Sequence, residues 1–117
     1  MKAEKYAPEI ISAKGAPEGA EVSYIARNSD LEPYYKKGDT VYLRRRLPDD
    51  GEVGLFAVDG RMVARQYVQD SEGTVYLFCL KRRRGRDIVV PKDKRRPGCF
   101  GTVITPEIPP LPRELLD

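Results

Sequence analysis

The chain has 117 residues, 40% of them hydrophobic, which is room for one globular domain with one modest core. The formal net charge of +3 is mild, and the absence of histidine excludes Ser-His-Asp catalysis and histidine-based zinc hydrolysis. No stretch reaches the roughly 20 apolar residues of a membrane span, and the first residues lack the apolar centre of a secretory signal. We therefore expect a cytoplasmic protein with no membrane partner, cofactor or metal.

Residues 1–20 form an N-terminal segment with weak signals, in which Pro8 and Pro17 flank the apolar pair Ile10–Ile11. We expect at most one short strand there. From residue 21 to 105, β-branched and aromatic runs alternate with turn residues, which is typical of an all-β domain. The predicted strands are residues 22–27, 40–45, 52–58, 61–68, 74–80, 87–90 and 100–105. Glycine-containing breaks at residues 38–39, 50–51 and 72–73 allow the chain to reverse.

The clearest element is a hairpin across Asp59–Gly60, because a two-residue Asp-Gly loop favours the type I′ turn. This turn predicts the pairing register, which is Val58 with Arg61, Phe56 with Val63 and Gly54 with Arg65. Both faces of the hairpin are largely apolar. We therefore expect it to lie centrally, covered on each side.

Residues 81–96 form a basic block, with nine Lys/Arg against two Asp. The block contains no aromatic residue on which bases could stack, so a solvated loop or an acidic protein partner is favoured over nucleic acid. Cys79 and Cys99 are interpreted as two small core side chains.

The end of the chain, residues 106–117, is rich in proline and is predicted to be an extended tail. A tail that packs on the domain or stays mobile is favoured over a proline-rich docking ligand.

Residues 28–43, Asn-Ser-Asp-Leu-Glu-Pro-Tyr-Tyr-Lys-Lys-Gly-Asp-Thr-Val-Tyr-Leu, resemble the signature of the LexA, UmuD and phage-repressor family. That signature is Gly-Asp-Ser-Met-x-Pro, a short spacer, Gly-Asp and an apolar strand, with Leu31 here in place of methionine. Residues 50–56, 59–67 and 99–104 resemble later family strands in the same order. The resemblance covers residues 19–104. It implies a LexA C-terminal-like, or signal-peptidase-like, β domain of several short and mostly antiparallel strands.

Members of this family cleave their own chain with a serine nucleophile and a lysine base. Alignment on Glu32–Pro33 places Asp30 at the serine position, and alignment on Asp59–Gly60 places Arg65 at the lysine position. Arginine stays protonated in proteins and offers no basic lone pair. The resemblance therefore implies a degenerate dyad and no catalytic residue. We predict that Asp30 and Arg65 converge in the former cleft as an ion pair.

A competing alignment keeps Ser29 as the nucleophile and sets Ala64 against the lysine, but Pro33 then loses its register. Ala64 supplies no base, and Lys36 and Lys37 in a solvated loop would be protonated at neutral pH. Ser29 is better interpreted as a turn-forming hydroxyl.

In the family the cleaved bond lies well upstream of the serine. Lys14–Gly15 is the one faint candidate here, and it lies too close to Asp30. We expect the cleavage segment, and the helix-turn-helix domain that would bind DNA, to be missing from this chain.

The resemblance favours a dimerisation or regulatory domain of a LexA-like or prophage-type transcription regulator, such as a repressor, without self-cleavage. The expected partner is a second copy, and residues 100–105 with the tail are the candidate interface. Two alternatives remain: a self-cleaving peptidase trapped by substitution, and a stand-alone module that binds a peptide in the cleft or an acidic partner at the basic block.

Overall fold

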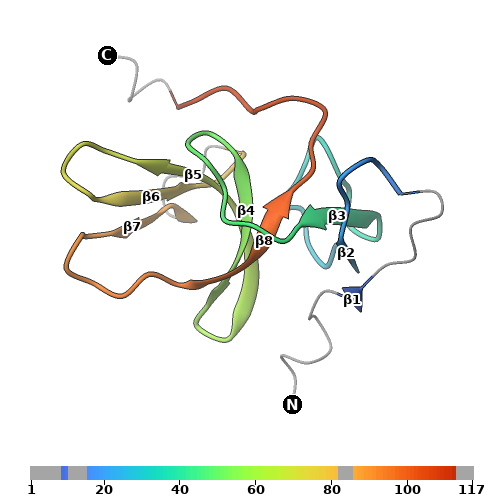
Figure 1. Cartoon of the computed structure of the whole chain (residues 1–117), viewed down its shortest axis with the longest axis horizontal. Coiled ribbons are helices and arrows are strands. Elements are labelled where there is room, and N and C mark those ends of the chain that lie inside the picture. Colours follow the sequence, from blue (N-terminus) through green and yellow to red (C-terminus); the bar gives the residue numbers. More distant parts are fainter. Residues whose placement is uncertain (1–8, 11–15, 82–85, 113–117) are drawn as a thin grey trace.

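The computed structural model describes residues 9–10, 16–81 and 86–112, and its architecture is all-β, as the sequence predicts (Figure 1). All strand pairs are antiparallel and belong to one sheet, in the order β1-β2-β3-β8-β4-β5-β6-β7. The strands are β1 (Glu9–Ile10), β2 (Val22–Ile25), β3 (Thr40–Arg44), β4 (Val53–Val58), β5 (Arg61–Gln69), β6 (Val75–Phe78), β7 (Ile88–Val90) and β8 (Gly98–Val103).

Each predicted strand is present, and its ends either coincide with the prediction or differ from it by one or two residues. Two differences have identifiable causes. β2 stops at Ile25 because the pairing with β3 becomes irregular at the next residue: the Ala26 N–H still donates to Asp39 O at 2.9 Å, but the Ala26 carbonyl accepts from the Gly38 N–H at 2.8 Å, which closes the loop. β6 stops at Phe78 because the N–H of Cys79 donates to the Asp87 carboxylate at 2.8 Å instead of to a strand.

The β4–β5 hairpin has the predicted register, with Val58 opposite Arg61, Phe56 opposite Val63 and Gly54 opposite Arg65. Both turn residues have positive φ, 50° at Asp59 and 77° at Gly60, as a type I′ turn requires. Because the register holds, alternate side chains of the hairpin point to opposite faces of the sheet.

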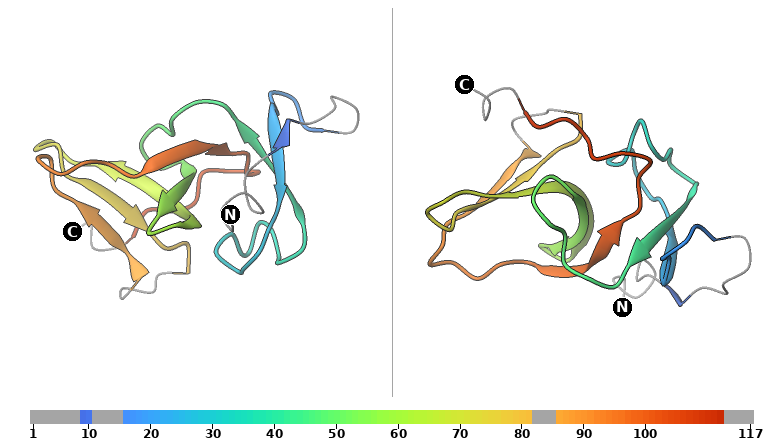
Figure 2. Two further views of the ribbon diagram at one scale, coloured as in Figure 1. Left: turned by 90° about the horizontal axis from the view of Figure 1, so that it is seen from below. Right: turned by 45° about the horizontal axis from the view of Figure 1, so that its top comes forward.

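Apolar clusters cover both faces of this hairpin, which confirms its predicted central position. The larger cluster consists of Val22, Ala26, Leu31, Val41, Leu43, Val53, Leu55, Ala64 and Val103. The smaller cluster consists of Phe56, Val75, Leu77 and Val90. The two clusters fit a strongly curled sheet, in which β1–β3 and β5–β7 lie on either side of β8 and β4 (Figure 2).

β8 lies between β3 and β4, so its two edges are hydrogen-bonded over part of its length. Opposite Leu55 and Phe56 the register shifts, which leaves Phe100 as an extra residue in a β-bulge. At Gly101, φ is 149° and an added Cβ would lie 2.4 Å from Arg44 O. Only glycine fits where β8 turns past the end of β3.

The described part of the tail, through residue 112, packs on the domain without joining the sheet. The amide of Gln66, which is fully buried, donates to Pro109 O at 2.7 Å and to Gly51 O at 3.0 Å. Tyr35 Oη donates to Ile104 O. The Gln66 bonds tie the proline-rich segment to β5 and to the loop before β4, and the Tyr35 bond ties the residue after β8 to the loop between β2 and β3. Residues 113–117 lie outside the described ranges.

Candidate functional site

A cleft of about 680 Å³ opens beside the turn of the β4–β5 hairpin. One wall comes from the end of β2 and the loop after it, and the opposite wall comes from the hairpin and Arg86. The lining residues are Tyr24, Arg27, Asn28, Asp30, Leu55, residues 59–65 and Arg86.

Residues 59–65 line this cleft without interruption. Alternate side chains of a strand point to opposite faces, so a continuous run of residues borders one cleft only along the edge of the strand. β6 pairs with β5 at Gln66–Gln69 alone. Within the described chain, therefore, no strand pairs with the outer edge of β5 from Arg61 to Arg65, and this edge faces the cleft.

Asp30 and Arg65 meet at the inner end of the cleft, which confirms the predicted ion pair. One guanidinium nitrogen of Arg65, Nη1, lies 3.1 Å from Asp30 Oδ2. The Arg65 side chain is 6% exposed and that of Asp30 is 19% exposed. Arg65 also donates from Nε to Arg86 O at 3.3 Å. The contact therefore joins the loop after β2, strand β5 and the segment before β7.

The same two side chains bind the backbone of Ala64. Its N–H donates to Asp30 Oδ2 at 3.2 Å, and its carbonyl accepts from Arg65 Nη1 at 2.8 Å. The ion pair thus takes up both backbone groups that Ala64 would offer to a neighbouring strand. It closes the inner end of the open β5 edge.

A short turn holds Asp30 in this position. The Asp30 N–H donates to Asn28 Oδ1 at 2.9 Å, and the Glu32 N–H donates to Ser29 O at 3.1 Å. Leu31 is buried in the larger core and anchors the turn. Glu32 forms an ion pair of 3.0 Å with Lys81, which ties the turn to the chain after β6.

Two groups near the ion pair keep their protons at neutral pH. Burial raises the pKa of the Tyr24 phenol, and the nearby Asp30 carboxylate raises it further. Burial also raises the pKa of the Cys79 thiol, an effect that Arg65 opposes. Neither group is therefore activated as a base or nucleophile. Cys79 is buried and Cys99 is half-buried, both as thiols, which fits their interpretation as core side chains.

Ser29 lies in a small hollow next to the main cleft, with Cys79, Leu80, Lys81 and Arg86. Asp30, rather than Ser29, contacts Ala64 and Arg65. Of the two residues that the alternative alignments place at the nucleophile position, Asp30 is therefore the one that contacts β5. Lys36 and Lys37 are exposed in the loop before β3, and Lys14–Gly15 lies outside the described residues.

Sequence reasoning did not find Arg27, Arg61 and Arg86 as part of this site. Arg61 was within reach of prediction, because it directly follows the Asp59–Gly60 turn. Arg86 belongs to the predicted basic block, of which residues 82–85 lie outside the described ranges. Nothing in the sequence pattern indicates that the Arg86 carbonyl accepts a hydrogen bond from Arg65 Nε.

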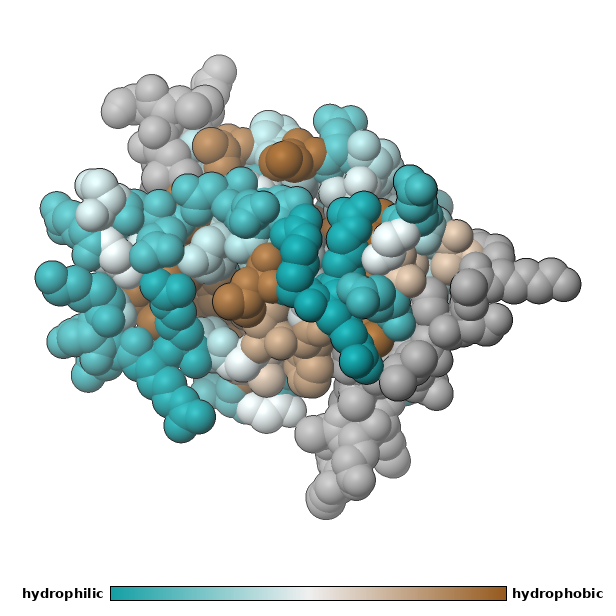
Figure 3. Space-filling view, in the orientation of Figure 1, coloured by the Kyte–Doolittle hydropathy of each residue, from teal (hydrophilic) through white to brown (hydrophobic). Residues whose placement is uncertain are grey.

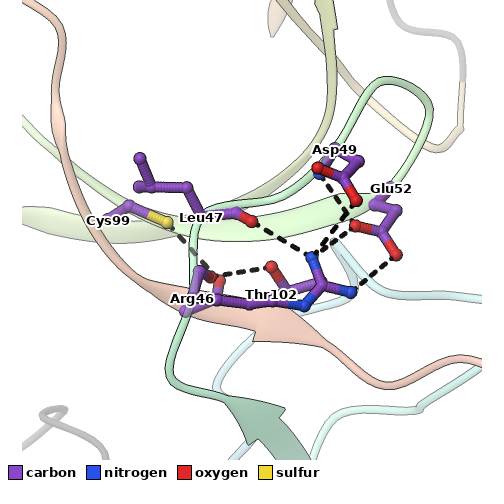
Figure 4. Close-up of polar contacts among 7 residues, drawn as sticks. Arg46, Leu47, Asp49, Glu52, Cys99 and Thr102 are labelled. Carbon is purple, nitrogen blue, oxygen red and sulfur yellow. Dashed lines mark hydrogen bonds and ion pairs between the residues drawn. The ribbon is translucent and has the colours of Figure 1, made fainter.

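A second arginine–carboxylate contact lies on the surface, in the loop between β3 and β4 (Figure 4). Arg46 donates to both carboxylate oxygens of Glu52, at 2.8 and 3.0 Å, and to Leu47 O at 3.1 Å. Thr102 Oγ1 donates to Arg46 O at 2.8 Å, which fixes this loop to β8. The hydrogen bond from Arg46 lowers the pKa of Glu52.

The described residues were also searched for a metal site and for a membrane-spanning helix. Among these residues no group of three or more His, Cys, Asp and Glu could hold a metal ion. None of their helical turns is long and apolar enough to cross a membrane.

No protein family model, no curated protein and no solved structure matches this chain. The interpretation of the cleft therefore depends on its own geometry.

Proposed function

We propose that this chain is a LexA-like domain that has lost self-cleavage and acts as the dimerisation or regulatory domain of a transcription regulator, such as a prophage-type repressor. The observation that carries the proposal is the contact between Asp30 and Arg65 at the inner end of the cleft, 3.1 Å long. In the family that the sequence resembles, a serine and a lysine converge in such a cleft. Here a carboxylate and a guanidinium do so, and neither can carry out that reaction.

A domain of this kind works by binding. Its proposed partner is a second copy of the chain, and DNA would be bound through a helix-turn-helix domain rather than through this β domain. Such a regulator works in the cytoplasm. Strand β8 is internal to the sheet, so a second copy contacts its exposed side chains rather than adding a strand to it.

Apolar side chains available for this contact lie on the loop before β4, on β8 and on the tail. Leu47 is 71% exposed and Ile108 is 60% exposed, and Phe100 and Leu111 are also exposed. The loop and the tail are neighbours, since Ile108 Cγ2 lies 3.3 Å from the Cβ position of Gly51. Figure 3 shows apolar areas near the centre and at the upper margin of this face, among hydrophilic residues.

Sedimentation velocity tests the proposal. We expect a dimer at tens of micromolar protein, with the double variant L47S/I108S shifted to monomer. The matched control V89S changes an exposed valine on β7 and should leave the dimer intact. A strict monomer at all concentrations would contradict the proposed role.

The alternative of a trapped peptidase has its own test. The variant D30S/R65K restores the dyad of the family, and self-cleavage of a chain that carries an upstream segment would favour that alternative. We expect no cleavage by the unchanged chain.

A further inference from the structure

The tail shows a three-residue pattern of burial. Pro109 and Pro112 are buried, whereas Ile108, Pro110 and Leu111 are exposed. Proline fixes its own φ and restricts the residue before it to extended conformations, so this whole segment is biased towards the polyproline II helix. Because that helix has three residues per turn, the two buried prolines lie on the same side of it. The tail therefore packs on the domain as a polyproline helix with one side inward.

The side chain of Gln66 receives this helix. It is fully buried, and its amide nitrogen donates to Pro109 O at 2.7 Å and to Gly51 O at 3.0 Å. The carbonyls of a polyproline helix have no partner within the helix, so they accept from donors outside it. Removal of the tail would take an acceptor away from a fully buried amide, which is unfavourable. Gln66 is therefore placed to recognise a polyproline carbonyl.

Two neighbours of Gln66 complete the contact. Phe78 lies directly opposite Gln66 in the β5–β6 pair, and its ring stacks on that of Tyr76. Cross-strand partners share one face of a sheet, so aromatic surface adjoins the Gln66 amide. The tail also runs past the loop before β4 (Figure 1), where the absence of a Cβ on Gly51 allows Ile108 to approach closely. Aromatic surface beside a polyproline helix is the usual arrangement in domains that bind proline-rich segments.

We propose that the surface formed by Gln66, Phe78 and Gly51 is a polyproline-binding site, that the tail is its resident ligand, and that a Pro-x-x-Pro segment of another protein can replace the tail. None of these three residues lines the cleft. The site itself is independent of dimerisation. One consequence rests on the proposed function: displacement of the tail would remove Ile108 from the apolar contact surface, so a proline-rich partner would oppose the dimer.

Fluorescence anisotropy with a labelled octapeptide of residues 105–112 tests this inference. In the unchanged chain the tethered tail competes at an effective concentration of about 1 mM, so the added peptide should bind weakly. The variant P109A/P112A keeps the full chain and weakens the resident tail. We expect this variant to bind the peptide at least about tenfold more tightly than the unchanged chain does.

Two altered peptides test the recognised spacing. One carries alanine in place of the buried prolines, Pro109 and Pro112, and the other carries alanine in place of the exposed prolines, Pro106 and Pro110. Both lose two prolines, so the difference between them reports the inward positions rather than the stiffness of the peptide. We expect binding to weaken at least about tenfold for the first and about twofold for the second. The unchanged chain at higher concentration gives the same comparison, which therefore does not depend on the folding of P109A/P112A.

Variants of the site locate the binding. Added to P109A/P112A, the replacement Q66M exchanges the donor for an apolar side chain of similar size and should weaken peptide binding about fivefold. The matched control Q69M changes the other glutamine of β5, whose side-chain oxygen accepts from Tyr67 Oη, and should have no effect. Circular dichroism of each variant checks that the chain has folded.

Any of four results would overturn the inference: equal binding of the peptide by the unchanged chain and by P109A/P112A, binding by neither, an equal loss with the two altered peptides, or an equal loss with Q66M and Q69M. Sedimentation of the same samples separates this inference from the proposed function. A dimer that binds no peptide refutes only the inference, and a monomer that binds the peptide refutes only the dimerisation.

Discussion

Two arginine–carboxylate contacts of this molecule differ in geometry and in burial. Arg46 donates two hydrogen bonds to the Glu52 carboxylate, but the Arg46 side chain is 40% exposed. Arg65 reaches Asp30 through one nitrogen only, and its side chain is 6% exposed. The surface contact has the better hydrogen-bond geometry, whereas removal of one partner from the buried contact should lower the free energy of unfolding more. A charge left without its partner in the interior keeps the cost of its desolvation, while an exposed charge regains water.

The largest expected effect comes from breaking the buried pair. D30A leaves the Arg65 guanidinium buried beside the Ala64 carbonyl and removes the acceptor of the Ala64 N–H. We expect the free energy of unfolding to fall by about 3 kcal/mol, measured by urea denaturation. The matched control D93A changes an exposed aspartate and should alter stability by less than about 0.5 kcal/mol.

Replacing both partners sharpens this prediction. The double variant D30L/R65M removes the charges together and fills the space with apolar atoms. Its stability should return to within about 1 kcal/mol of the unchanged protein, because no buried charge remains unpaired. If the double variant were as unstable as D30A, the desolvation argument would be wrong and the Ala64 hydrogen bond would be the dominant contribution.

The surface contact should respond much less. R46A is expected to lower the free energy of unfolding by about 1 kcal/mol or less, since exposed pairs are screened by water and salt. Urea denaturation at low and at high salt checks this, and the difference between R46A and the unchanged protein should shrink at high salt. A loss as large as that of D30A would remove the contrast between the two contacts.

The smallest effect is a dependence on pH. Arg46 lowers the folded-state pKa of Glu52, so the stability from this contact is present above the ordinary glutamate pKa of about 4.3. It is lost as pH falls below that value and through the lower folded pKa, because the unfolded chain takes up the proton first. We expect E52Q to flatten the decline of stability in this acid range and to leave the neutral range almost level, as followed by thermal unfolding.

The parts of this site that sequence predicted correctly depend on local signals. The Asp59–Gly60 turn fixed the register of the hairpin, and the register fixed which residues share a face. The position of Asp30 opposite Arg65 came from a resemblance spread over several ordered motifs, and the contact is present. The hairpin register can be predicted from the turn residues alone, and the Asp30–Arg65 contact from the order and spacing of motifs along the chain.

The missed parts depend on long-range partners. Nothing near residue 98 indicates that β8 lies between β3 and β4, because strand order is decided by pairings far apart in the sequence. The sequence places Gln66 in a predicted strand but gives no sign that its side-chain amide donates a hydrogen bond to Pro109 O of the tail. Among the described strands, the short overlap of β6 with β5 leaves the edge at Met62 without a strand partner, and a pattern of apolar residues does not specify such an overlap.

The position of β8 also has a consequence for the order in which the chain can fold during synthesis. A ribosome-bound chain that has not yet delivered residues 98–103 can form the hairpins β2–β3 and β4–β5, but among the described strands none of the backbone pairings that join these two parts of the sheet can form yet. β8, the last of the described strands along the chain, is the one that links them. Completion of the sheet must therefore wait until residues 98–103 have been synthesised, and the earlier hairpins keep unpaired edges until then.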